Sequence, residues 1–389
     1  MRQVTCHRAT VLVYASHQYR DDLAERTKVN EQRLARLRRR MEETRTDLVV
    51  IGPSSHMVWL AGLAPHGDER PVLLMVSRAG TGLLIPALNV DSQRPLTSVP
   101  FFSWADADGP AAALDDLFAS LKLPSRPRVV LDETMRADFA LLVLDALTYA
   151  DRSFTQATVG ALRAVKDDAE YGALKRNAVI NDRVMEAAFA SLRLGITEDE
   201  VAAVIRDAYA AGGARREFIS VCFGEHGAFP HHTSGDRRLA NNEAVLIDIG
   251  GRSEGYPSDM TRVGTFGEAP VEFDAVWSIV NRAVEAALAA VKPGNPAKLV
   301  DQAARDVITA AGYGDRFPHR TGHGLGIDVH EEPYITGTSE RPLQVGNVFS
   351  IEPGIYLPGR FGIRLEEIVI VRENGPEIFS ALPRTAFRR

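Results

Sequence analysis

The stretch VLIDIGGRSEGYPSDMTRVGTF, residues 245–266, decides the fold of the chain around it. Two apolar runs are joined by a short polar segment that contains glycine and proline, and this pattern predicts a β-hairpin. Asp248 lies inside the first run and Asp259 begins the second, a spacing that fits two carboxylates facing each other. A buried carboxylate without a partner has its pKa raised by as much as ~3–5 units, which costs stability. The two acids of this hairpin therefore need a positively charged partner.

Two further acids fall inside apolar, strand-like runs near the C-terminus. Glu352 lies in VFSIEPG and Glu366 in GIRLEEIVIV. Any one of the four acids could be a structural acid, since buried charges are usually paired with a base. For all four together this interpretation weakens, because Arg262 and Arg364 are the only bases nearby in these strands. Two divalent cations would balance four carboxylates, so the set predicts a metal site.

His323 offers a nitrogen ligand within RTGHGLGIDVHEEP, residues 320–333. Each of its neighbours Gly322, Gly324 and Gly326 would cost about 1 kcal/mol in a helix relative to alanine, so we expect a loop or a bulged strand. We interpret the glycines as room for a metal cluster and its substrate. An oxygen-rich set with one imidazole suits Mn²⁺, Co²⁺, Fe²⁺ or Zn²⁺, and two such ions can activate a bridging water.

The order of expected elements divides the chain into three parts. Residues 1–27 are expected to be an N-terminal extension, to which we assign no function. Residues 28–155 alternate helices with short apolar runs, as is typical of a small α/β domain, and residues 149–159 have the polar composition of a linker. Residues 156–389 predict two helices followed by strands, twice over. This order indicates a duplicated α+β unit in the second domain.

The bulk composition excludes several classes of protein. The 389 residues are 45% hydrophobic and 25% charged, with a formal net charge of -6, which argues against a nucleic-acid partner. No apolar run approaches the ~20 residues of a membrane span, so no membrane partner is expected. Cys6 and Cys222 are the only cysteines, too few for a disulfide framework. We expect a cytoplasmic protein.

Two short motifs predict local secondary structure. GRSEG, residues 251–255, has the spacing of a serine-hydrolase elbow with Ser253 as the nucleophile, but that elbow requires a strand, a sharp turn and a helix. YPSDMTRVGTF follows here and has strand character, so we predict a hairpin turn instead. Thr197 and Glu200 form a capping-box pattern, which predicts the start of a helix.

The acids and His323, taken with their flanking residues, resemble a known family. LIDIG, SDMTR, GHGLG, IEPG and IRLEE, in this order over about residues 160–389, are similar to the ligand motifs of M24-type metallopeptidases with the pita-bread fold. That family includes methionine aminopeptidase, aminopeptidase P and prolidase. The α/β segment before them resembles the creatinase/prolidase N-terminal domain, which implies the proline-specific branch. The resemblance also implies a homodimer.

The resemblance implies a role for each site residue. Asp259 and Glu366 would bridge two metal ions, Asp248 would hold one ion, and His323 with Glu352 the other, with Mn²⁺ as first choice and Co²⁺ or Zn²⁺ as alternatives. Glu352 would also carry the proton. His231 and His330 would donate hydrogen bonds to the substrate, and Arg364 would fix a ligand carboxylate. Tyr356 matches the EPGIY run of the family. His232 has no counterpart in the family and is expected to be a surface residue.

The substrate implied by the resemblance is a small Xaa-Pro peptide. A dipeptidase needs a cation for the proline carboxylate, whereas aminopeptidase P needs open space there. Arg341 lies too close to the EPG glutamate to match a prolidase arginine, and Asp68 with Arg70 in APHGDERPV could form a substrate-covering loop or a salt-linked turn. We expect an Xaa-Pro dipeptidase. The alternatives are aminopeptidase P, a same-fold hydrolase or lyase of a small osmolyte, a metal-free creatinase-type hydrolase, and a pita-bread binding module, the last two disfavoured by the complete ligand set.

Overall fold

A computed structural model describes residues 29–389 of the protein. The extension expected at residues 1–27 lies outside these residues. The chain forms two compact units, divided between Leu162 and Arg163, and each unit has its own sheet and hydrophobic core. Within the described residues, no helix combines the length and apolar character needed to cross a membrane.

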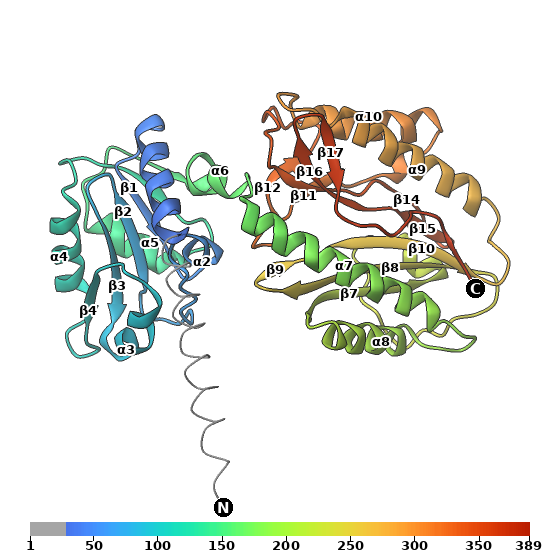
Figure 1. The fold of residues 1–389 in the computed structure, drawn as a ribbon, viewed down its shortest axis with the longest axis horizontal. Coiled ribbons are helices and arrows are strands. Elements are labelled where there is room, and N and C mark those ends of the chain that lie inside the picture. Colours follow the sequence, from blue (N-terminus) through green and yellow to red (C-terminus); the bar gives the residue numbers. More distant parts are fainter. Residues whose placement is uncertain (1–28) are drawn as a thin grey trace, which may run out of the picture. The chain divides into compact units, whose positions relative to one another are not determined.

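The N-terminal unit is an α/β domain around a mixed sheet of order β4-β3-β2-β1-β5-β6, coloured blue to green in Figure 1. Its strands are β1 (Leu48–Ile51), β2 (Leu73–Ser77), β3 (Thr81–Pro86), β4 (Phe101–Trp104), β5 (Arg128–Leu131) and β6 (Asp151–Phe154). Its helices are the one over residues 29–43, then α2 (Ser55–Ala61), η1 (Ala87–Asn89), α3 (Val90–Gln93), η2 (Arg94–Leu96), α4 (Ala111–Leu121), α5 (Ala137–Asp145), η3 (Thr155–Ala157) and part of α6 (Val159–Arg163).

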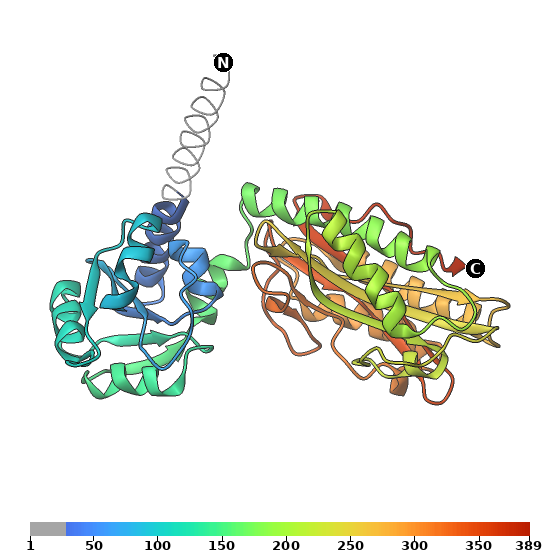
Figure 2. The ribbon, with the colours of Figure 1, turned by 90° about the horizontal axis from the view of Figure 1, so that it is seen from below.

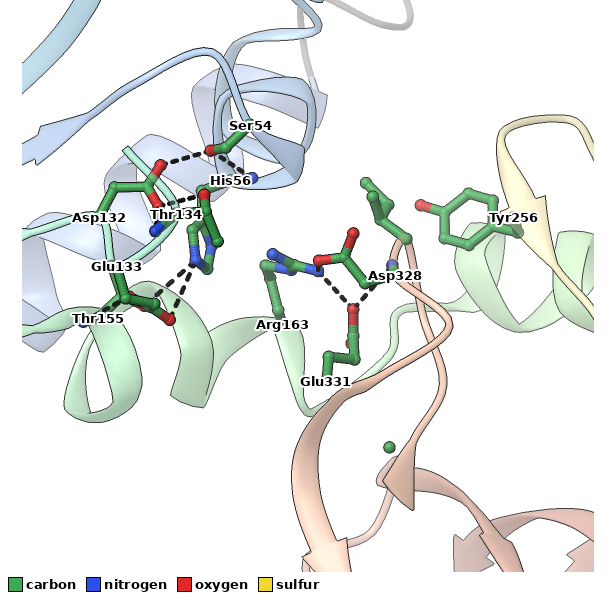
Figure 3. A network of polar contacts seen from close by, with 12 residues as sticks. Ser54, His56, Asp132, Glu133, Thr134, Thr155, Arg163, Tyr256, Asp328 and Glu331 are labelled. Carbon is green, nitrogen blue, oxygen red and sulfur yellow. Dashed lines mark hydrogen bonds and ion pairs between the residues drawn. The ribbon is translucent and has the colours of Figure 1, made fainter. Parts of the chain in front are cut away.

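The composition of residues 149–159 suggested a linker, but the segment is also part of the N-terminal sheet. It contains β6, which pairs in parallel with β5 at the edge of the sheet. All four residues of β6 are exposed, and this explains a polar composition that resembles a linker. Next to it, Glu133 accepts hydrogen bonds from the hydroxyl of Thr155, and Asp132 accepts them from Ser54 and Thr134 (Figure 3).

The C-terminal unit contains two helix pairs, each followed by strands. The first half consists of α7 (Asp168–Ala190), α8 (Glu198–Ala211), β7 (Arg215–Phe223), η4 (Gly224–Ala228), β8 (Glu243–Ser253), β9 (Tyr256–Pro257) and β10 (Met260–Phe266). The second half consists of α9 (Phe273–Ala290), α10 (Lys298–Ala310), η5 (Gly314–Arg316), β11 (Gly322–Gly324), β12 (Glu331–Ile335), β13 (Val348–Ile351), β14 (Gly354–Leu357), β15 (Phe361–Arg364), β16 (Glu367–Arg372), β17 (Gly375–Ile378) and β18 (Phe387–Arg388).

The sheets of this unit lie between the two helix pairs. One sheet has the order β18-β10-β8-β7, with β9 paired to β8; the second has the order β12-β11-β13-β16-β17, and β14 pairs with β15. Helices α7 and α8 cover one side, and α9 and α10 cover the other (Figures 1 and 2). Apolar faces of each helix pair meet the strands in separate buried clusters. The expected duplicated α+β unit is confirmed.

The local motifs behave as their residues predict. Thr197 and Glu200 form both hydrogen bonds of a capping box at the start of α8. Ser253 pairs with Tyr256 across a tight turn whose two central residues, Glu254 and Gly255, have φ values of 52° and 85°. Positive φ at both positions is typical of a type I′ hairpin. GRSEG is therefore a hairpin turn, and no helix follows Ser253.

Candidate metal centre

The hairpin of β8 and β10 places Asp248 and Asp259 on one face of the sheet. Asp248 lies opposite Thr261, and Asp259 precedes Thr261 by two residues, just before β10 begins. Residues two apart on a strand point to the same side, so the two carboxylates are diagonal neighbours rather than a directly opposed pair. The Asp259 side chain is almost fully buried, and that of Asp248 is 20% exposed.

The second half of the unit supplies the remaining predicted ligands. Glu352 follows β13 and Glu366 precedes β16, and these strands pair with Ile351 opposite Glu367. His323 is the central residue of β11, which pairs with β13. Its Nε2 lies 3.2 Å from Glu352 Oε1 and 3.7 Å from Asp259 Oδ2. The β8–β10 hairpin and the neighbouring strands β11, β13 and β16, from distant parts of the chain, thus bring the five residues to one cavity of about 770 Å³.

The charge of this cluster is not balanced within the protein. Asp248 Oδ1 and Glu366 Oε1 are buried and accept no hydrogen bond from the described residues. Burial, together with the neighbouring carboxylates, raises the pKa of both Asp259 and Glu366 well above the ordinary range. Burial would also raise the pKa of Glu352, but the hydrogen bond and charge of His323 lower it to about 2. Divalent cations fit this donor set, because carboxylate oxygens with one imidazole suit such ions.

Arg364 connects Asp248 with Glu366, one ligand from each half of the C-terminal unit. Its guanidinium donates to Asp248 Oδ2 at 2.6 Å and to Thr261 Oγ1 at 3.0 Å, and Thr261 in turn donates to Glu366 Oε2 at 2.9 Å. Arg364 also donates to the hydroxyl of Tyr356 at 2.9 Å. Burial raises the pKa of Tyr356 to about 12, so this hydroxyl keeps its proton. Tyr356 of the EPGIY run therefore belongs to the polar network of the site.

His319 joins the same network and was missed by sequence reasoning. Its Nε2 lies 2.7 Å from the Tyr356 hydroxyl, and its side chain lines the cavity. Burial lowers the pKa of His319, which favours a neutral ring. The available signal was its position, one residue before the quoted stretch and four before His323.

The predicted substrate-facing histidines both line the cavity. The ring of His330 meets that of His323 edge to face, with centroids 4.2 Å apart. Partial loss of hydration and the positive charges of His323 and Arg320 lower the pKa of His330 to about 4, so its ring is neutral near pH 7. His231 is exposed on the cavity wall.

Comparison with known proteins identifies the family. The model of metallopeptidase family M24 matches residues 172–373, and that of the creatinase/prolidase N-terminal domain matches residues 33–165. The chain belongs to metallopeptidase family M24. The resemblance inferred from the five motifs is confirmed, as is the pita-bread fold behind a creatinase-type N-terminal domain.

The chain is similar over most of its length to proteins named dipeptidase or prolidase. The chain is 37% identical to the probable dipeptidase PepE of Mycobacterium tuberculosis over 334 residues, which is 84% of this chain and 88% of that one. The crystal structure of dipeptidase PepE from Mycobacterium ulcerans matches with a TM-score of 0.89 at 37% identity, covering 93% of this chain and 98% of that one. The recombinant prolidase of Thermococcus sibiricus matches with a TM-score of 0.85 at 30% identity, covering 92% and 99%.

His232 is not a surface residue in this M24 enzyme, so that expectation was wrong. Its side chain is 16% exposed, and its Nε2 lies 3.0 Å from Oε2 of the buried Glu198. The error arose because Glu198 is distant in sequence, so nothing adjacent to His232 indicates a buried partner.

The arginines considered for the substrate carboxylate have protein partners. Arg341 pairs with Glu332 at 3.1 Å. In the N-terminal unit, the Arg70 guanidinium makes two hydrogen bonds of 3.0 Å to Asp106, and the carboxylate of Asp68 accepts from the Arg70 amide. This geometry is that of a salt-linked turn. A role for Asp68 and Arg70 in substrate binding stays a prediction.

We interpreted the glycines around His323 as room for a metal cluster and its substrate, and this interpretation was wrong. A Cβ atom on Gly322 would lie 1.8 Å from the carbonyl oxygen of Ser350, and one on Gly324 would lie 2.3 Å from that of Glu332. A Cβ on Gly326 would lie 2.2 Å from Glu331 Oε1. The M24 enzyme therefore needs these glycines because neighbouring protein atoms approach their backbone closely.

Proposed function

We propose that this M24 metallopeptidase hydrolyses Xaa-Pro peptide bonds, with dipeptides as its preferred substrates and two divalent cations as cofactors. The observation that carries the proposal is the buried, unbalanced set of four carboxylates and one imidazole on the cavity wall. The names dipeptidase and prolidase, given to relatives that cover most of the chain, support it.

Five residues would hold the ions. Asp259 and Glu366 would bridge them, Asp248 would bind one, and His323 with Glu352 would bind the other; Mn²⁺ is our first choice, with Co²⁺ or Zn²⁺ as alternatives. When bound, the ions would activate a water molecule and stabilise negative charge on the substrate carbonyl oxygen. Arg364 would keep Asp248 oriented, since partners of ligand carboxylates tune such sites.

The remaining steps belong to side chains of the protein. The nitrogen of an Xaa-Pro bond carries no hydrogen, so it must receive a proton before proline departs. We assign the transfer of that proton to Glu352, whose carboxylate is held at the cavity wall by contacts of 3.0 Å with Ser350 and 3.2 Å with His323. The neutral ring of His330 and the exposed ring of His231 can donate hydrogen bonds to the carbonyl oxygen or flanking groups as charge develops.

Arg320 supports the preference for dipeptides. It lines the same cavity, is half-buried, and stacks on the ring of Tyr334 at 4.7 Å. No acid among the described residues forms an ion pair with Arg320, whereas Arg364, the other arginine of the cavity wall, is bound to Asp248. A cation without an acidic partner in the site suits the free carboxylate of a C-terminal proline.

The test is release of proline from Xaa-Pro dipeptides and the corresponding Xaa-Pro-Yaa tripeptides, with and without Mn²⁺. We expect metal-dependent cleavage that favours dipeptides. Full activity after removal of metal would refute the proposal, cleavage of tripeptides alone would favour aminopeptidase P, and cleavage of neither would favour an osmolyte-like substrate. Arg320→Gln should raise KM for dipeptides about 10- to 100-fold, the loss of one charge-assisted hydrogen bond, and leave tripeptides nearly unchanged.

Two further expectations belong to the proposal. We expect a homodimer, which sedimentation of the purified chain would test. We also expect a cytoplasmic enzyme, in keeping with its two cysteines, of which Cys222 is free and buried.

A further inference from the structure

A second group of ligand-type side chains lies outside the carboxylate cluster. Glu198 is the first residue of α8, His226 lies in η4, and His232 follows six residues later. One potential ligand atom from each lies within 4.8 Å of those of the other two. We call these three residues the Glu198 cluster. None of them belongs to the proposed dinuclear site.

The carboxylate of Glu198 is fully buried and firmly oriented. Its Oε1 accepts a hydrogen bond from the Phe223 amide at 2.9 Å, and its Oε2 accepts one from the Gly235 amide at 3.1 Å. A carboxylate oxygen has two lone pairs, so each oxygen keeps one free for another partner. The two imidazoles are these second partners, one on each oxygen.

The imidazoles converge on that carboxylate from the exposed side. His226 Nδ1 lies 2.8 Å from Oε1, and His232 Nε2 lies 3.0 Å from Oε2. The ring centroids are 4.2 Å apart, so protonation of both rings would place two positive charges next to each other. The side chains are 29% and 16% exposed, which leaves a path for an ion from solvent.

We propose that the Glu198 cluster binds one Zn²⁺ ion. Two imidazole nitrogens and one carboxylate are a common ligand set of zinc, and a fourth position would remain for water. The amide hydrogen bonds to Glu198 would fix the ligand carboxylate in the way that outer partners do in zinc sites. A bound ion would replace the two imidazole–carboxylate hydrogen bonds. Both rings would then bind the ion, and their close approach would no longer place two positive charges next to each other.

This site would act on the segment that carries His231. Ser220 donates a hydrogen bond to the His232 carbonyl at 2.8 Å, and the Gly235 amide is held by Glu198, so the segment is fixed at and directly after its histidines. An ion held by Glu198, His226 and His232 would link both ends of the segment over residues 226–232 to α8. It would thereby restrain His231, the neighbour of His232 on the cavity wall.

The test uses the full chain with the proposed dinuclear site disabled by Asp259→Asn. We expect this variant to bind one Zn²⁺ per chain by equilibrium dialysis and elemental analysis, and Zn²⁺ to raise its thermal unfolding midpoint, since a ligand of the native state stabilises it. Adding His226→Asn should weaken Zn²⁺ binding at least about tenfold and remove the midpoint shift. His66→Asn, at an exposed histidine of the N-terminal unit, should change neither.

The outcomes separate this proposal from the proposed function. Equal Zn²⁺ binding and equal midpoint shifts with and without His226→Asn would overturn the zinc site and leave a hydrogen-bonded cluster only. Circular dichroism of the metal-free His226→Asn variant shows whether it folds; if it does not, His232→Asn replaces it under the same criteria. Because all measurements are made without substrate, a failure of Xaa-Pro hydrolysis would not affect them.

Discussion

Glu331 and Glu366 are both buried in the C-terminal unit, with 8% and 2% of their surface exposed, but their surroundings differ. Glu331 accepts a hydrogen bond from Arg163, which also pairs with Asp328 at 2.7 Å (Figure 3). It accepts a second hydrogen bond from Lys166 at 2.7 Å. Glu366 lies among other carboxylates, with one of its oxygens unpaired. Burial opposes ionisation at both positions, but neighbouring cations lower the pKa of Glu331, whereas neighbouring acids raise that of Glu366 further.

The difference separates a structural acid from a functional one. The group around Glu331 is neutralised by protein cations and joins Arg163 and Lys166, before α7, to β12. The carboxylate cluster instead keeps a negative charge that folding alone leaves uncompensated, a common feature of functional sites. The predictions below test this contrast, from the largest effect to the smallest.

Asp259→Asn should remove most of the hydrolytic activity. The change deletes one negative charge and one ligand oxygen from the centre of the cluster, and loss of metal assistance is worth several kcal/mol. We expect a fall in kcat/KM on the order of 10³-fold, equivalent to about 4 kcal/mol. The measurement is dipeptide hydrolysis together with metal content. Asp182→Asn, an acid of α7 that bonds Ser380 and Ala381, is the matched control and should retain activity.

Glu331→Gln should reduce stability rather than metal binding. The change leaves Arg163 and Lys166 buried without their main counter-charge, and breaking a buried pair costs about 3–5 kcal/mol. Urea unfolding of metal-free protein measures the loss. Glu254→Gln, which breaks an exposed pair with Arg176, should cost less than about 1 kcal/mol.

Urea unfolding of metal-free Glu366→Gln tests whether Glu366 differs from Glu331 as a functional acid differs from a structural one. In metal-free protein this change removes a carboxylate from a repulsive group, so the free energy of unfolding should stay the same or rise. A loss as large as that of Glu331→Gln would mean that Glu366 is a paired structural acid after all.

The acids of the metal cluster could be predicted because each interrupts or borders an apolar run of the sequence. Only Asp248 lies inside a strand, whereas Asp259, Glu352 and Glu366 lie next to strand ends. Asp248 within VLIDIGG and Glu366 at the start of EEIVIV are charged residues in otherwise apolar sequence, so the sequence alone indicates that they need a partner. The contacts of His319 and His232 could not be predicted in this way. Tyr356 and Glu198, their partners, come from other elements, and only the packed fold brings them together.

The glycines near His323 show a second limit. Their number in RTGHGLG indicates close approach, which is correct, but the approaching atom is set by strand pairing. Gly324 of β11 lies opposite Phe349 of β13 and Glu331 of β12, so protein surrounds it on both sides. Sequence periodicity identifies a strand, whereas the identity of its neighbours requires the register.

Gly322→Ala tests whether this strand packing positions His323. The added Cβ would lie 1.8 Å from Ser350 O, a backbone atom that can move only if β11 and β13 separate. We expect a loss of about 1–3 kcal/mol in unfolding free energy, the usual cost of overpacking, and weaker metal binding. Gly235→Ala is the control, because its Cβ would meet no atom within 4 Å, and it should be neutral or slightly stabilising. Equal effects of the two changes would show that close packing at Gly322 is not required.

The last prediction concerns the pH dependence of the Glu331 group. Burial would raise the pKa of Glu331, but the charges of Lys166 and Arg163 exceed that effect and lower it below its ordinary value of 4.5. A depressed folded-state pKa means that the unfolded chain binds the proton more readily, so the contribution of Glu331 is complete above pH 4.5 and is lost as the pH falls through the folded-state value. The difference in unfolding free energy between the wild type and Glu331→Gln, measured on metal-free protein, should therefore be constant from neutral pH down to about 5 and shrink below 4.5. A difference that already shrinks between pH 7 and 5 would require a raised pKa for Glu331, as for Glu366, and the distinction between the two buried acids would then be lost.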